Sequence, residues 1–120
     1  MLLTGAAGGL GKILRDRIKP WADVVVLSDI ADMGEAREGE EIVQCDLADK
    51  AAVMKMMEGV DAVLHFASPA SPVDYAKWPI PTLKVGALGT HNALGLAKHK
   101  KAKFMLASTS EVYEIGRAHV

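Results

Sequence analysis

The sequence predicts an α/β fold built on a doubly wound parallel sheet, on the strength of three observations. Short runs of aliphatic and β-branched residues alternate with segments of helical periodicity, the pattern of repeated strand–helix–strand units. A glycine-rich turn joins the first strand to the first helix. Half of the 120 residues are hydrophobic and about a quarter are charged, which is ordinary for an α/β protein with one modest core.

The hydrophobic runs predict five strands, so the sheet is expected to be truncated after about the fifth strand. The run Val24–Ser28 is apolar up to its last residue, as suits a strand that is buried on both faces. The strands are expected at residues 1–4, 24–28, 42–44, 60–66 and 104–107.

Helices are predicted at residues 10–18, 51–57 and 82–99. The first is expected to stop at Lys19-Pro20, and the second to be capped by Asp49 and ended by Gly59. Four prolines in residues 67–81 predict a rigid, irregular loop. Met54, Met56 and Met57, at helical spacing, are expected to fill the core.

Composition excludes several functional classes. The net charge of −1 provides no general attraction to nucleic acid or to an anionic membrane, so neither is expected as a partner. The basic run Lys98–Lys103 is interpreted as the solvated end of a helix, with a phosphate patch as the alternative. Cys45 is the only cysteine, so no internal disulfide is possible.

No metal site is expected, because the four histidines lack the spacing of zinc ligands. His65 is expected to be a packed strand residue. No stretch approaches the length of a membrane helix, and the N-terminus does not resemble a signal peptide. The expected location is the cytoplasm.

The turn after the first strand carries the strongest motif. Its glycines, Gly5-x-x-Gly8-x-x-Gly11, suit a tight turn, a close approach of backbone to a pyrophosphate, and close packing of helix on strand. The following helix would direct its N–H groups at the phosphates. This predicts a Rossmann-type dinucleotide site, with cofactor contacts from Gly5, Ala7, Gly8, Gly9, Leu10 and Gly11.

Two acidic positions extend the predicted site. Asp29, with Ile30, follows the second strand 18 residues beyond Gly11, where a carboxylate can accept both ribose hydroxyls. No arginine follows before Arg37 to neutralise a 2′-phosphate, which favours NAD over NADP. Asp46-Leu47 is placed to contact the adenine. The alternatives are a strand-end cap for Asp29 and a helix-start acid for Asp46.

The glycine spacing, Asp29 and the His65-Phe66-Ala67 turn together resemble the extended short-chain dehydrogenases/reductases, the NAD-dependent epimerase/dehydratase family. Residues 2–66 resemble its uronate dehydrogenases, through LLTGAAGGLGK, LSDIA and CDLADKAAV. Residues 65–113 resemble its UDP-glucuronate decarboxylases, through HFASPASPVDY and FMLASTSEVY. A junction of two genes near Phe66 is one hypothesis for this difference.

The resemblance implies further roles for individual residues. Phe66, Ala67, Ser68, Pro69 and Ser108 would lie against the cofactor, and Lys84 would reach the ribose of the nicotinamide half. The family's catalytic Thr-x-Glu triplet corresponds to Thr109, Ser110 and Glu111, and serine in the middle suits a decarboxylase, which needs no acid there. Tyr113 is not expected to be the catalytic base, because residue 117 is Arg where the family's Tyr-x-x-x-Lys has Lys. This chain is therefore expected to lack that pair and to be inactive by itself.

Three functions remain open at this point. The first is the NAD-binding part of a UDP-glucuronate decarboxylase-like enzyme, which oxidises a sugar carbon transiently, releases carbon dioxide and returns the hydride. The second is a uronate dehydrogenase acting on a free uronic acid. The third is a non-catalytic dinucleotide-binding module. For the enzymes, the resemblance implies a homodimer formed through the helix at 82–99.

The last six residues, Ile-Gly-Arg-Ala-His-Val, correspond to one reading frame of a common sequencing-library adapter followed by a stop codon. We interpret residues 115–120 as non-native read-through, Glu114 as a hybrid codon, and residues 1–114 as a partial NAD-binding domain. The alternative is a natural, divergent C-terminus.

Overall fold

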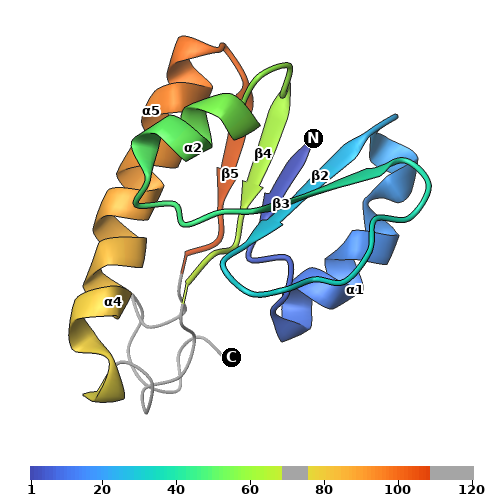
Figure 1. The fold of residues 1–120 in the computed structure, drawn as a ribbon. Helices are drawn as coiled ribbons and strands as arrows, with labels where there is room; N and C mark the ends of the chain where they lie inside the picture. The colour runs from blue at the N-terminus through green and yellow to red at the C-terminus, as the bar shows by residue number, and fades with distance from the viewer. Residues whose placement is uncertain (69–75, 109–120) are drawn as a thin grey trace, which may run out of the picture.

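A computed structural model describes residues 1–68 and 76–108, and its centre is a five-stranded parallel sheet. The strands lie in the order β3-β2-β1-β4-β5 (Figure 1). Their bounds are β1 Leu2–Thr4, β2 Val25–Asp29, β3 Glu40–Gln44, β4 Ala62–His65 and β5 Lys103–Leu106. The predicted α/β class with five parallel strands is confirmed.

Helices cover both faces of the sheet. In Figure 1, α1 lies on one side and α2 and α5 lie on the other. The helical segments are α1 Gly9–Arg17, the 3₁₀ turn η1 Lys19–Trp21, α2 Lys50–Met56, α4 Pro79–Leu83, the π-helical segment η2 Lys84–Gly89 and α5 Thr90–His99. Among the described residues, no helix is long and apolar enough to cross a membrane.

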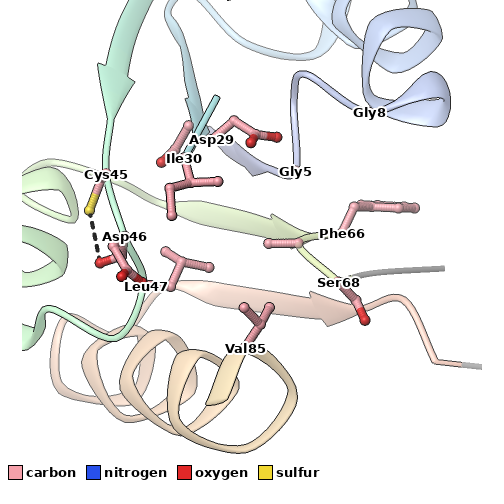
Figure 2. Close-up of a pocket in the computed structure, with 12 residues that line it drawn as sticks. Gly5, Gly8, Asp29, Ile30, Cys45, Asp46, Leu47, Phe66, Ser68 and Val85 are labelled. Carbon is pink, nitrogen blue, oxygen red and sulfur yellow. Dashed lines mark hydrogen bonds between the residues drawn. The ribbon is translucent and has the colours of Figure 1, made fainter. Parts of the chain in front are cut away.

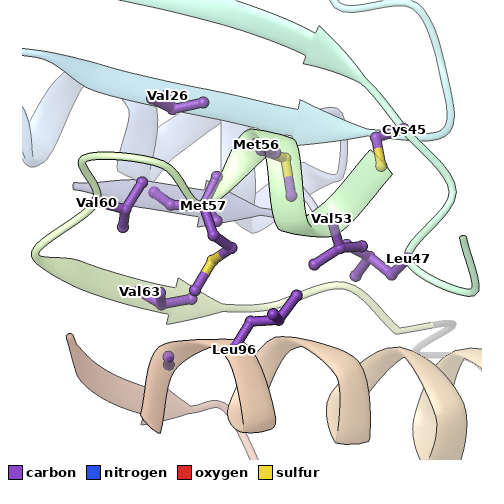
Figure 3. Packing of buried hydrophobic residues seen from close by; sticks show 11 residues of the cluster. Val26, Cys45, Leu47, Val53, Met56, Met57, Val60, Val63 and Leu96 are labelled. Carbon is purple, nitrogen blue, oxygen red and sulfur yellow. The ribbon is translucent and has the colours of Figure 1, made fainter. Parts of the chain in front are cut away.

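The alternation of side chains along the strands produces two hydrophobic cores. Leu3, Val25 and Leu27 pack with Ile18 on the α1 face. Leu2 and Val26 point to the opposite face, where they join the cluster beneath α2 and α5 (Figure 3). That cluster contains Leu2, Val26, Cys45, Leu47, Val53, Met56, Met57, Val60, Val63, Leu96 and Ala97. Met56 and Met57 are buried as predicted, whereas Met54 is 46% exposed and is not a core residue.

The strand order reverses at β1. The chain passes from β1 to β2 and β3 on one side, then crosses to β4 and β5 on the other. In open parallel sheets this reversal leaves a crevice at the carboxyl ends of the central strands, where ligands bind. Thr4 and His65 stand opposite each other at these ends of β1 and β4.

Several predicted boundaries differ from the structure, including the start of the fourth strand, which lies at Ala62 and not at Val60. Two of the differences have identifiable reasons. The third strand begins at Glu40, not Ile42. Two glutamates precede Ile42 and suggest an exposed segment, but the Glu40 side chain is buried in an ion pair with Arg15. The long helix begins at Pro79, not Thr82, so residues 67–81 are not irregular throughout. Pro79 and Pro81 occupy the first helical turn, where a backbone N–H has no partner to lose.

The segments α4, η2 and α5 follow one another without leaving helical geometry, because the backbone at Leu83, Lys84, Gly89 and Thr90 is right-handed α at each boundary. A π-helical stretch within an α-helix is rare and is frequent at functional sites.

Candidate functional site

A cavity of about 280 Å³ opens at the predicted crevice, where the ends of β1, β2, β3 and β4 converge (Figure 2). Figure 2 shows Asp29 beside the glycine turn, and Leu47 and Val85 on the side of the long helix. The lining residues are Gly5, Gly8, Ser28, Asp29, Ile30, Cys45, Asp46, Leu47, Phe66, Ala67, Ser68 and Val85.

Backbone crowding explains two glycines of the turn. Gly5 has a φ of +73°, and a Cβ there would lie 2.7 Å from the backbone carbonyl of Phe66. At Gly11, a Cβ would overlap the carbonyl oxygen of Gly5 and lie 2.8 Å from the Cα of Ala6. The motif therefore lets α1 and the Phe66 turn approach the same short loop.

Among the described residues, no side chain caps the N-terminus of α1. Gly8 precedes the helix without any side-chain hydrogen bond, and the first turn has no acidic residue. A helix start with free N–H groups, beside a glycine turn, is a ready site for an anion.

Asp29 is held in place by two backbone donors. Its Oδ2 accepts from the Ala7 N–H at 3.0 Å, and its Oδ1 accepts from the Ala31 N–H at 3.0 Å. A carboxylate offers about four acceptor positions, so both oxygens keep capacity for further donors in the cavity that Asp29 lines.

Arg37 is engaged away from the cavity. Its guanidinium donates to Asp16 on α1 at 2.8 Å, and its backbone N–H donates to Glu40 at 2.8 Å. None of the described residues that line the cavity is Lys or Arg. A phosphate on the ribose 2′ position would therefore meet Asp29 without a cation to offset the repulsion.

The opposite wall is formed by the segment after β3. Asp46 Oδ1 accepts from the Ala48 N–H at 2.9 Å, while Asp49, as predicted, caps α2 by accepting from the Ala52 N–H at 3.2 Å. Asp49, not Asp46, is thus the helix-start acid. Cys45 is buried in this wall, and its burial raises the pKa of the thiol above its usual value.

A buried polar cluster lies behind the cavity. Thr4 Oγ1 is 2.8 Å from His65 Nδ1 and accepts from the N–H groups of Phe66 and Ala67 at 3.1 and 3.3 Å. The other imidazole nitrogen, Nε2, is 3.1 Å from Thr90 Oγ1. Burial lowers the pKa of His65, which is a packed strand residue, as predicted.

The structure brings many of the predicted cofactor residues to one cavity: Gly5, Gly8, Asp29, Ile30, Asp46, Leu47, Phe66, Ala67 and Ser68. Others are not among its lining residues: Ala7, Gly9, Leu10, Gly11, Lys84 and Ser108. Of these, Ala7 orients Asp29, Gly11 allows the tight turn, and Lys84 precedes the lining residue Val85. Thr109, Ser110, Glu111, Tyr113, Pro69 and the tail at 115–120 lie outside the described residues.

Sequence reasoning missed Ser28, Cys45 and Val85. Ser28 directly precedes Asp29, and Cys45 directly precedes Asp46. Their position next to two predicted site residues could have identified them. Val85 comes from a helix that meets the cavity only through tertiary packing. No group of His, Cys, Asp and Glu able to hold a metal ion occurs within residues 1–68 and 76–108.

Comparison with known proteins gives three consistent results. The NAD dependent epimerase/dehydratase family model matches residues 1–119. Uronate dehydrogenase of Pseudomonas putida is 61% identical over 67 residues, which is 55% of this chain and 25% of that protein. UDP-glucuronic acid decarboxylase 1 of Danio rerio is 39% identical over 122 residues, which is 99% of this chain and 29% of that protein.

The fold is also found in solved structures. A mutant uronate dehydrogenase from Agrobacterium tumefaciens, crystallised in complex with NAD, matches with a TM-score of 0.79 and 33% identity, over 90% of this chain and 40% of that one. The chain thus spans roughly a quarter to two-fifths of the length of these relatives. The similarity to the decarboxylase covers 99% of this chain, and the structural similarity to the uronate dehydrogenase covers 90% of it. Each therefore extends beyond the half of the chain that carries the corresponding sequence motifs.

Proposed function

Because this chain belongs to the NAD-dependent epimerase/dehydratase family, we propose that its cavity binds NAD. The observation that carries the proposal is Asp29, a carboxylate fixed by the Ala7 N–H beside the glycine turn, in a cavity whose described lining contains no Lys or Arg. That arrangement suits a ribose diol next to a pyrophosphate.

The residues present fit this cofactor. Ser28 Oγ is buried and has no hydrogen-bond partner in the described part of the chain, although Ser28 lines the cavity. A buried hydroxyl of this kind is costly unless a ligand or water satisfies it. Because Gly5 has no side chain, the Phe66–Ala67 backbone lies directly against the glycine turn, and both segments line the cavity together.

Each part of NAD has a proposed position. The pyrophosphate would lie over Gly5–Gly11 at the uncapped start of α1, with contacts at Ala7, Gly8, Gly9 and Leu10. Asp29 and Ile30 would hold the adenine ribose, and Asp46 and Leu47 the adenine. Phe66, Ala67, Ser68, Lys84 and Ser108 would contact the nicotinamide half.

We further propose that this chain is part of a longer enzyme, and that this enzyme resembles the UDP-glucuronate decarboxylases. Bound NAD would supply a reversible hydride acceptor for a sugar carbon. Thr109, Ser110 and Glu111 are the proposed catalytic triplet, and the described chain ends just before them, at Ser108. The Ala107 N–H, just after β5, donates to the His65 carbonyl at 3.0 Å, next to the Phe66 turn. Similarity over 99% of the chain supports this assignment.

The second candidate is a uronate dehydrogenase. Its support is the higher identity, 61%, over 67 residues to the Pseudomonas putida enzyme.

An activity assay distinguishes the candidates, in which the full protein encoded by the source gene is incubated with NAD and either UDP-glucuronate or glucuronate. A decarboxylase releases carbon dioxide without net NADH, since the hydride is returned, whereas a dehydrogenase accumulates NADH absorbance. Binding of NAD with neither product supports the third candidate, a non-catalytic dinucleotide-binding module.

We also propose a cytoplasmic homodimer. Three apolar residues on the helix from Pro79 to His99 are largely exposed: Ile80 by 69%, Leu83 by 71% and Leu94 by 50% of the residue surface. A row of exposed apolar residues on one helix suits association with a second copy. The single cysteine suits a reducing compartment.

Calorimetric titration with NAD tests the cofactor assignment. Asp29→Asn is expected to weaken NAD binding at least ~10-fold, since hydrogen bonds to a charged group are worth about 1.5–3 kcal/mol. Asp32→Asn is the matched control, because Asp32 lies in the same loop outside the cavity lining. NADP should bind at least ~10-fold more weakly than NAD. Equal loss in both variants, or equal affinity for the two nucleotides, would contradict the assignment.

A further inference from the structure

The hydrogen atoms of the Thr4–His65–Thr90 cluster can be assigned from its geometry. A threonine hydroxyl has one donor and two acceptor positions. The N–H groups of Phe66 and Ala67 both donate to Thr4 Oγ1, at 3.1 and 3.3 Å, and so occupy both acceptor positions. The Thr4 hydroxyl proton is therefore left for His65 Nδ1, 2.8 Å away.

This fixes the tautomer of His65. Nδ1 accepts from Thr4, so the neutral ring carries its proton on Nε2 and donates it to Thr90 Oγ1 at 3.1 Å. An imidazolium would place a third donor against Thr4 Oγ1, beyond its acceptor capacity. Thr4 and His65 together tie the Phe66–Ala67 turn, which lines the cavity, to the start of α5.

The same turn of α5 contacts the other wall of the cavity. Asn92 is buried, and its Nδ2 donates to the Leu47 carbonyl oxygen at 2.9 Å. At Gly89, an added Cβ would lie 3.2 Å from the Leu47 Cβ, so the helix backbone packs closely on this residue. Leu47 lines the cavity beside Asp46.

We infer that Thr90 and Asn92 are positioning residues for the dinucleotide pocket. Neither lines the cavity. Thr90, through His65 and Thr4, holds the Phe66–Ala67 turn, while Asn92 holds Leu47, so one helical turn sets the distance between two walls that bind different halves of the ligand. The inference rests on the proposed binding of NAD.

Paired substitutions test this role. Thr90→Val keeps the shape of the side chain and removes its hydroxyl, and Thr90→Ser keeps the hydroxyl. Asn92→Asp keeps the shape and removes the donor to Leu47. We expect Thr90→Val and Asn92→Asp each to weaken NAD binding about fivefold or more, and Thr90→Ser to stay within about twofold of the parent chain. His91→Ala, an exposed neighbour on α5, is the control.

Nitrogen-15 spectra of the histidine rings provide a readout that general destabilisation does not reproduce. The parent chain should show His65 as the neutral Nε2–H tautomer, and Thr90→Val should alter the Nε2 signal while the protein stays folded. If the parent chain binds NAD and Thr90→Val and Asn92→Asp bind it equally well, the positioning role is wrong and NAD binding stands. If the parent chain does not bind NAD, both proposals fall.

Discussion

Gly11 shows how a single missing Cβ shapes the site. It belongs to α1 and is buried against the loop that precedes the helix. Any side chain there would collide with the Gly5 carbonyl oxygen and with Ala6, which are backbone atoms that cannot rotate away. The helix can therefore approach the glycine turn only because residue 11 has no side chain.

Gly11→Ala is expected to destabilise the chain by about 1–3 kcal/mol, the range found for overpacked sites, and to abolish NAD binding. Chemical denaturation and calorimetry measure the two effects. Gly95→Ala is the matched control, since nothing lies within 4 Å of a Cβ at Gly95 on α5. There, alanine should leave NAD binding unchanged and raise the helix stability by up to about 1 kcal/mol. Equal effects at the two positions would contradict this account.

Individual site residues could be predicted from the sequence where their spacing along the chain follows from the shape of the ligand site. The glycine spacing, Asp29 and Asp46-Leu47 were predicted because a phosphate turn and a ribose acceptor occur at set distances along the chain. Val85 and Thr90 were not predicted as parts of the site or its support. They reach the pocket region from a helix that is distant in sequence, and no local pattern records that packing.

Among the elements, the attachment of α1 to β3 depends on a buried ion pair. Arg15 donates to Glu40 through Nε at 2.9 Å and through Nη2 at 2.7 Å, and Lys19 lies 3.6 Å from the same carboxylate. Arg15 also donates to the carbonyl oxygens of Met33 and Glu35, in the loop after β2. The hydrogen bond from Arg15 is the main cause that lowers the pKa of Glu40 to about 2.

Glu40→Gln is expected to lower the free energy of unfolding by about 3 kcal/mol at pH 7, because it leaves Arg15 buried without its partner. The ionised Glu40 contributes stability above its ordinary pKa of 4.5, and this is lost as the pH falls from 4.5 toward 2. The variant should lack that loss in urea unfolding measured across pH. Glu41→Gln, at an exposed neighbour, should behave like the parent chain. An unchanged acid profile in Glu40→Gln would refute the role of the pair.

His65 on β4 gives the stability of the chain a second dependence on pH. Because burial lowers the pKa of His65, the unfolded chain binds a proton more readily below pH 6.5 than the folded chain does. Stability should therefore already begin to fall below pH 6.5, and this loss should persist in Glu40→Gln.

Element boundaries were predicted less well than element types. The start of β3 was missed because a charged residue is buried there through a partner on another helix. The start of the long helix was missed because prolines suggest a loop, although the first helical turn tolerates them. The π-helical segment Lys84–Gly89 has no sequence pattern that distinguishes it from an ordinary helix.

For the whole molecule, the reversal of strand order at β1 brings distant segments to one crevice. Residues from the turns after β1, β2, β3 and β4 meet there, although they span positions 5 to 68. The alternation of strands and helices predicted this topology, since parallel strands joined by right-handed crossovers leave few alternatives. The assignment of residues 115–120 to a non-native tail, and a junction near Phe66, stay predictions.

Self-association should depend on the long helix. Leu83→Asp, at a side chain that is 71% exposed on α4, is expected to shift a concentration-dependent dimer to monomer in light scattering after gel filtration. Ile13→Asp, at a side chain that is 59% exposed on α1, makes the same change on the opposite layer and should leave the dimer intact. A monomeric parent chain, or dissociation by both substitutions, would contradict the proposed interface.

The central claim is that the crevice binds NAD, and amide spectra of nitrogen-15-labelled chain during an NAD titration test it most directly. The account predicts saturable shifts that concentrate at Gly5, Ala7, Gly8, Ile30, Leu47 and Ala67, and a midpoint in Asp29→Asn that requires at least ~10-fold more NAD. Absence of saturable shifts in the parent chain, or shifts centred on another face of the sheet, would contradict it.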